Sequence, residues 1–212
     1  MNTILIAIIV ANALFSFKGF NDHAFFRKYE FHMGSIRSGE QIRLLSSAFL
    51  HADIGHLAFN MITLYFFAPV VIGYLGTFSF AIIYFGSLIF GSLLTILFHK
   101  NDYNYRAVGA SGAVTGILYS AILLEPNMML GIFFIIPIPA YIFGILYLLY
   151  SIYGMRAKND NIGHTAHFGG AIGGFLITLI TNPHLLIENT LMVVLLTIPI
   201  VILFAMAKMG KI

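Results

Sequence analysis

Two polar side chains in this otherwise apolar chain have the types needed for nucleophilic catalysis. Ser111 lies between glycines in the stretch GASG, and His167 stands in the glycine-rich stretch AHFGGAIGG. A serine hydroxyl becomes a good nucleophile when a base within about 2.6–3.2 Å takes its proton, and imidazole is the usual base near neutral pH. Ser111 and His167 are therefore the candidate nucleophile and general base.

Two further polar residues have the spacing of an oxyanion hole. His56 and Asn60 stand four residues apart in HADIGHLAFN, on one face of a predicted helix. Attack on a carbonyl creates an oxyanion, which needs hydrogen-bond donors where the charge develops. His56 and Asn60 can offer N–H groups side by side. The backbone amide of Ser111, at a predicted helix N-terminus, adds a third donor favoured by the helix dipole.

The same residues favour a Ser-His dyad over a triad or a metal site. None of the eight acids lies inside a predicted span, and burying an ionised carboxylate in hydrocarbon is costly. The histidine pairs His51/His56 and His164/His167 raise metal binding as an alternative. No H-E-x-x-H motif occurs and no carboxylate lies within either helix to complete a zinc site. We therefore expect no metal and no cofactor.

The composition requires a lipid environment for the elements that position these residues. The 212 residues are 59% hydrophobic and only 9% charged, against about 25% charged in soluble domains. This predicts a multi-pass integral membrane protein with one membrane domain over residues 1–212 and the lipid bilayer as a partner. The eleven Lys and Arg residues form no cluster, so nucleic acid is not expected. The absence of cysteine excludes disulfides.

Apolar runs bounded by charges, prolines and glycines predict an all-α polytopic bundle. We interpret the first run as a retained span, because no Lys or Arg precedes it as in a signal peptide. The segment 18–55 mixes basic and aromatic residues and predicts a structured loop at the membrane interface. The seven predicted spans are residues 3–17, 56–75, 78–98, 111–124, 129–151, 167–181 and 190–207.

The lengths of these spans predict that the four polar residues lie at one depth. Spans 111–124 and 167–181 rise only roughly 21–23 Å against a hydrocarbon core of about 30 Å. They run in the same direction and end at a common face, so Ser111 and His167 begin on the order of 7–9 Å below the other face. Asn60 comes to a similar height by the same arithmetic.

Small residues predict that the two short helices also pack closely. One stripe is Gly112, Gly116 and Ser120, and the other is Ala166, Gly170, Gly174 and Thr178. Stripes of this kind let the backbones of membrane helices approach each other. Each stripe begins beside one of the candidate catalytic residues, so we expect the serine and the histidine to converge.

These residues resemble the rhomboid family of intramembrane serine proteases. HADIGHLAFN is similar to the family's H-x-x-x-N block, GASG to its G-x-S-G block and AHFGGAIGG to its A-H-x-x-G-x-x-x-G block, in family order. The resemblance implies Ser111 as nucleophile and His167 as general base. It implies that His56, Asn60 and the Ser111 amide form the oxyanion hole.

The resemblance also implies an architecture and a substrate class. The core would comprise six helices over about residues 1–181, with one extra C-terminal helix over about 190–207 and a membrane-embedded loop at 18–55. Transmembrane or juxtamembrane segments of other proteins would be the substrates. The resemblance implies a bacterial-type cell membrane. Bacterial-type members usually open outward, and we favour that side for the active site. The positive-inside rule instead makes the active-site side cytoplasmic, because every Lys and Arg falls on that side.

Two other functions stay open at this point. One is a catalytically inactive rhomboid-like protein that binds membrane helices. Thr115 keeps this alternative open, because it stands four residues after the serine, where the family often has an aromatic that packs on the imidazole. The other is a small transporter, although the expected internal repeats are absent from the sequence. Neither the substrate nor the oligomeric state follows from the sequence.

Overall fold

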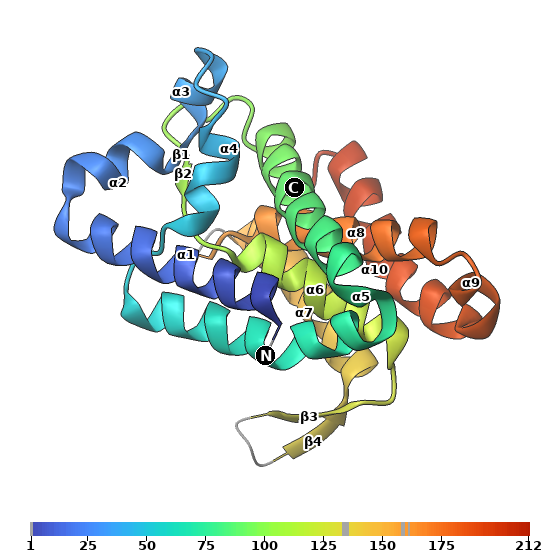
Figure 1. The fold of residues 1–212 in the computed structure, drawn as a ribbon. Coiled ribbons are helices and arrows are strands. Elements are labelled where there is room, and N and C mark those ends of the chain that lie inside the picture. Colours follow the sequence, from blue (N-terminus) through green and yellow to red (C-terminus); the bar gives the residue numbers. More distant parts are fainter. Residues whose placement is uncertain (1, 133–135, 158–159, 161) are drawn as a thin grey trace.

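The computed structural model describes residues 2–132, 136–157, 160 and 162–212 as a predominantly helical chain (Figure 1). The short strands pair as two small antiparallel ribbons, β1 with β2 and β3 with β4. The elements are α1 (Thr3–Asn21), α2 (His23–Tyr29), β1 (Phe31–His32), α3 (Met33–Arg37), α4 (Arg43–Ser46), a 3-10 turn (Ser47–Phe49), α5 (Ile54–Phe98), β2 (Arg106–Ala107), α6 (Ser111–Leu124), β3 (Met129–Ile132), β4 (Ile136–Pro139), α7 (Ala140–Ala157), α8 (His164–Thr181), α9 (Leu185–Glu188) and α10 (Thr190–Lys208).

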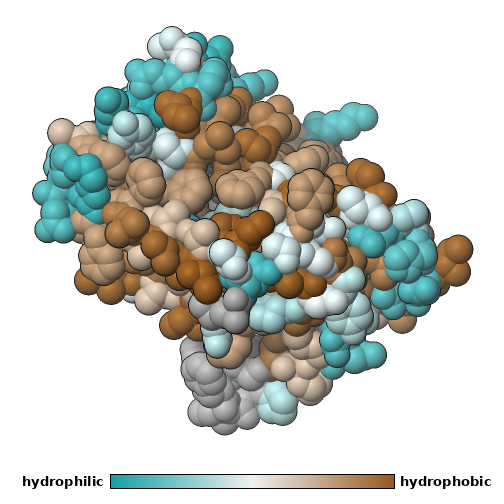
Figure 2. Space-filling view, in the orientation of Figure 1, coloured by the Kyte–Doolittle hydropathy of each residue, from teal (hydrophilic) through white to brown (hydrophobic). Residues whose placement is uncertain are grey.

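The chain is a multi-pass membrane bundle, as the composition predicts. Among the described residues, four helices are long and apolar enough to cross a membrane: α1, α5, α7 and α10. The 45-residue α5 contains a break at Gly76, whose φ of 81° is a conformation that glycine adopts readily. The break divides α5 into two helical parts, which correspond to the predicted spans 56–75 and 78–98. Figure 2 shows hydrophobic residues over much of the visible face, with hydrophilic ones gathered near α2, α3 and α9.

The predicted span 129–151 is wrong at its beginning. Residues 129–132 and 136–139 form the β3–β4 ribbon, and residues 133–135 of the predicted span lie outside the described residues. The helix α7 begins only at Ala140 and continues to Ala157. Pro137 and Pro139 explain the difference, because a proline lacks the backbone N–H of a helix and biases the preceding residue towards extended backbone.

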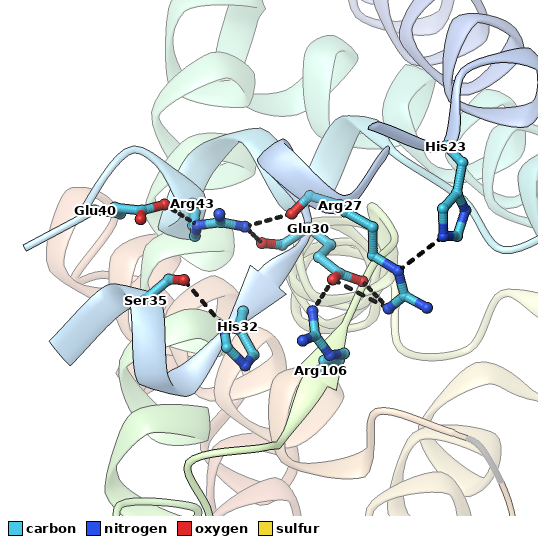
Figure 3. Close-up of polar contacts among 8 residues, drawn as sticks. All are labelled: His23, Arg27, Glu30, His32, Ser35, Glu40, Arg43 and Arg106. Carbon is cyan, nitrogen blue, oxygen red and sulfur yellow. Dashed lines mark hydrogen bonds and ion pairs between the residues drawn. The ribbon is translucent and has the colours of Figure 1, made fainter. Parts of the chain in front are cut away.

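The loop between α1 and α5 is folded, as predicted, and it is held by a buried arginine (Figure 3). The Arg43 guanidinium bonds the Glu40 carboxylate at 2.6 Å and donates to the carbonyl oxygens of Arg27 and Glu30 at 2.8 and 2.9 Å. The buried Glu30 carboxylate accepts in turn from Arg27 at 3.2 Å and from Arg106. The loop is thereby joined to β2, which leads to α6.

The helix α8 presents glycines to two neighbours at once. A Cβ placed at Gly170 or Gly174 would overlap the backbone of α6 at Gly112 or Gly116. A Cβ at Gly169 would lie 2.6 Å from the Phe90 carbonyl oxygen of α5. Backbone atoms therefore touch directly along these faces. The helices α5, α6 and α8 all pack directly against one another, with α6 in the middle of the bundle (Figure 1).

We expect Gly170→Ala to destabilise the protein by about 1–3 kcal/mol, because its methyl group meets the backbone of α6 rather than a flexible side chain. The matched control is Gly73→Ala in α5, where a Cβ has no neighbour within 4 Å. The control should be neutral or slightly stabilising, since alanine is the better helix former. Thermal unfolding in detergent micelles measures both. Equal stability of the two variants would contradict the packing described.

Candidate active site

A glycine with a positive φ and a set of backbone hydrogen bonds shape the turn that leads into α6. Gly109 has a φ of 124°, a conformation that other residues rarely adopt. Its amide donates to the Ser47 carbonyl oxygen at 3.0 Å, and the Ala110 amide donates to His51 Nε2 at 3.4 Å. Ser111 follows as the first residue of α6, as predicted, so its own amide has no acceptor within the helix.

His51 supports this turn by accepting a backbone hydrogen bond from it. It is fully buried, and its Nδ1 lies 2.8 Å from the Ser16 hydroxyl, which also donates to the Phe49 carbonyl oxygen. Burial, with a contribution from His56, lowers the pKa of His51 to about 3. The ring is therefore neutral at physiological pH, and its Nε2 is free to accept the Ala110 amide. His51 is a structural support for the turn that carries Ser111.

The structure brings Ser111 and His167 into direct contact. The Ser111 Oγ lies 2.6 Å from His167 Nε2. His167 stands one turn inside α8 rather than at its start, because α8 begins at His164, earlier than the predicted span. Gly170, one turn after His167, lets α8 approach α6 closely enough for the two side chains to meet.

His56 lies beside the candidate nucleophile. The N-cap residue Asp53 accepts the His56 amide at 2.8 Å and so fixes the first turn of α5. The His56 ring packs on Gly109. A Cβ added at Gly109 would lie 2.7 Å from His56 Cε1, 2.8 Å from His56 Nε2 and 3.7 Å from the Ser111 Oγ. A long hydrogen bond of 3.5 Å from the Ala52 amide to Nδ1 leaves the ring proton on Nε2.

Asn60 is buried one turn further along the same helix face. Its side chain is 3% exposed, and within the described part of the chain its Nδ2 has no hydrogen-bond partner. A buried amide without a partner costs about 1–3 kcal/mol. Such a group is available to a ligand that brings an acceptor.

Sequence reasoning missed one residue that contacts the histidine. The Tyr147 hydroxyl on α7 lies 2.8 Å from His167 Nδ1, and the two rings are stacked at 22° with centroids 5.9 Å apart. Thr115 instead donates its hydroxyl to the Ser111 carbonyl oxygen at 2.7 Å. The sequence signal for Tyr147 is its polar hydroxyl inside an apolar helix, but the contact with His167 depends on how α7 packs against α8.

The histidine pairs that raised metal binding have other contacts. The His51 and His56 rings are 4.9 Å apart, and His164 bonds Asp160 at 3.1 Å. Over the described residues, no group of three or more histidine, cysteine, aspartate or glutamate side chains is arranged to hold a metal ion.

A small cavity of about 40 Å³ adjoins Ser111. A buried water needs about 10–15 Å³ of such volume and two or more polar partners. The cavity is large enough for water, and its lining includes the polar residues Ser47, Ser92, Thr95 and Ser111.

A bundle of apolar helices that holds a serine against a histidine defines an integral membrane protein with a candidate serine-nucleophile site. The model of the Rhomboid domain matches residues 38–184, more than half of the chain. The chain belongs to the rhomboid family.

Its relatives include bacterial and mitochondrial proteins. It is similar to "RHOMBOID-like protein 12, mitochondrial" of Arabidopsis thaliana, with 30% identity over 79% of this chain and 55% of that protein. It is 34% identical to "Putative rhomboid protease YdcA" of Bacillus subtilis over 68% of this chain and 69% of that protein. It is 29% identical to "Rhomboid protein 1, mitochondrial" of Saccharomyces cerevisiae over 64% of this chain and 40% of that protein. The chain thus spans about half the length of the two mitochondrial relatives.

We expect Gly109→Ala to slow the reaction of Ser111 with a small fluorophosphonate probe by at least about tenfold, since a displacement of 1 Å at a reacting group can cost 100-fold. The methyl group would be strained at this φ and would displace the His56 ring. Gly163→Ala is the matched control, because a Cβ there meets only Ala166, at 3.9 Å. Equal labelling rates in the two variants would show that the turn does not position the serine.

Proposed function

We propose that this protein is an intramembrane serine endopeptidase that hydrolyses peptide bonds in or near transmembrane segments of other proteins. The observation that carries the proposal is the 2.6 Å contact between Ser111 Oγ and His167 Nε2 inside a membrane bundle. Membership of the rhomboid family supports it, as does the likeness to a relative named as a putative rhomboid protease.

The chemistry follows from the two side chains. His167 Nε2 takes the Ser111 proton as Oγ bonds to the carbonyl carbon of the scissile peptide. His167 then gives that proton to the leaving amine as the C–N bond breaks, and an acyl-enzyme is formed. Water activated by the same imidazole hydrolyses the ester and regenerates Ser111. The cavity beside Ser111 offers a place for that water.

The oxyanion is stabilised in this proposal by His56, Asn60 and the Ser111 amide. Among the described residues the Asn60 Nδ2 has no partner, the His56 ring carries its proton on Nε2, and the Ser111 amide has no acceptor within α6. Donors set in place before reaction lower the barrier because they need no reorganisation as charge develops.

The substrate segment must unwind before cleavage. A helical carbonyl is already hydrogen-bonded, and its neighbours shield it from attack. A transmembrane helix containing small or helix-breaking residues unwinds most readily, so such segments are the proposed substrates.

We further propose that residues 1–212 form one membrane domain, in which the family match over 38–184 lies mainly within the expected core of about 1–181. The sequence resemblance implies a bacterial-type cell membrane. The relatives do not favour that location, because two of those compared carry "mitochondrial" in their names.

Ser111→Ala and His167→Ala should each abolish cleavage of a model single-span substrate in proteoliposomes, because removing either partner of a nucleophile–base pair costs about as much as removing both. Both variants should express and unfold like the parent. The matched control is Ser92→Ala, a serine that lines the same cavity and donates its hydroxyl to the Leu44 carbonyl oxygen, away from the Ser111–His167 pair. It should retain activity. Cleavage by Ser111→Ala at the parental rate would refute the proposal and favour an inactive, helix-binding rhomboid-like protein.

A further inference from the structure

Tyr147 stacks on two other rings, one of which is the candidate base His167. Its ring is stacked on His167 at 22°, and it is also stacked on Phe143 at 17° with centroids 5.8 Å apart. Its hydroxyl is 2.8 Å from His167 Nδ1. One side chain thus fixes both the plane of the imidazole and its rotation within that plane.

The hydrogen bond also decides which ring nitrogen carries the proton. His167 Nε2 must be bare to accept the proton of the Ser111 hydroxyl, so a neutral ring carries its proton on Nδ1. Nδ1–H then donates to the Tyr147 oxygen. This is the position at which soluble serine hydrolases place a carboxylate.

A tyrosine suits this position because it accepts a hydrogen bond without a charge. An ionised carboxylate beside the base would have to be stripped of water inside the bundle. Asp160 does not take the role, because its oxygens bond His164 and Tyr150, each at 3.1 Å. The phenolic oxygen is the neutral acceptor that remains for His167.

The helix that carries Tyr147 is tied to the helix that carries the nucleophile. The Tyr119 hydroxyl of α6 donates to the Gly144 carbonyl oxygen of α7, one turn before Tyr147. A Cβ at Gly144 would lie 2.8 Å from Ile122 Cδ1 of α6, so the two helices are in close contact there. The position of Tyr147 relative to Ser111 is therefore set by packing between α6 and α7.

We propose that Tyr147 is the positioning residue of the general base: its hydroxyl holds His167 in the Nδ1–H tautomer and accepts from the imidazolium during turnover, while its ring holds the imidazole plane. The inference rests on the proposed peptidase function and assigns to α7 a direct part in it.

Tyr147→Phe keeps the ring and removes the hydroxyl. We expect kcat to fall about 3–10-fold with KM unchanged, since one neutral hydrogen bond is lost. Tyr147→Ala removes the stacking as well and should lower kcat by about 30-fold or more. Tyr153→Phe is the matched control: it lies on the same helix, its side chain is exposed, and it should keep the parental kcat. Thermal unfolding of every variant shows whether it is folded.

The tautomer gives a readout that a merely structural role would not move. The measurement is ¹⁵N-histidine NMR of the protein in micelles at about pH 8, where a histidine of ordinary pKa is neutral. The His167 signals are assigned by their loss in His167→Asn. They should report a protonated Nδ1 and a bare Nε2. Tyr147→Phe should shift them towards a mixture of tautomers, and Tyr153→Phe should not.

The outcomes separate this inference from the function on which it rests. An active parent whose Tyr147→Phe variant keeps both the parental kcat and the parental tautomer overturns the role of Tyr147 and leaves the peptidase intact. An unchanged tautomer with a reduced kcat also overturns the hydrogen-bond role. A parent without Ser111-dependent cleavage refutes the proposed function, and the tautomer measurement still tests the bond because it requires no turnover.

Discussion

Direct backbone contact between α6 and α8 is the constraint on which the site depends. In a bilayer, lipid tails are as apolar as leucine side chains, so helices associate through close packing and not through the hydrophobic effect. Gly170 and Gly174 supply that packing by meeting Gly112 and Gly116. Ser111 precedes the first contact on α6, and His167 precedes it by one turn on α8. The packing stripe therefore ends where the two reactive groups meet.

The second constraint is the cost of charge inside the membrane. The polar side chains gathered around Ser111 belong to serine, threonine, asparagine, histidine and tyrosine residues, and some of them bond one another or the backbone, as His51 and Ser16 do. The buried carboxylate of Glu30 lies in the loop outside the spans, where Arg27 and Arg106 neutralise it. A serine and a neutral imidazole can thus work at depth, while ionised groups are kept to the loops and helix ends.

The sequence predicts the start of α6 and the packing of α6 on α8 better than it predicts the start of α7. Ser111 is found at the start of its helix because the glycine-bounded apolar run and the Glu125-Pro126 stop both mark that helix clearly. The break in α5 is likewise marked by Gly73 and Gly76. The small-residue stripes predict the contact of α6 with α8, since residues four apart share a helix face.

The errors arise where an apolar run carries no periodic signal. The stretch from 129 to 139 is as apolar in sequence as a span, yet residues 129–132 and 136–139 are extended, and hydrophobicity alone does not distinguish a strand from a helix. The predicted start of α7 is therefore too early. The contact of Tyr147 with His167 depends on how α7 packs against α8, which an apolar run does not show. The contacts of Arg43 with the carbonyl oxygens of Arg27 and Glu30 depend on the tertiary path of the loop, which sequence spacing does not give.

The most direct test of this account is an experimental structure of the protein in lipid after reaction with a fluorophosphonate. The account predicts phosphorus bonded to the Ser111 Oγ, His167 beside the adduct, and the phosphonyl oxygen directed at the Asn60 side chain and the Ser111 amide. An unmodified Ser111 in a folded protein that has been exposed to the probe, or an adduct whose oxygen points away from Asn60 and the start of α6, would contradict it.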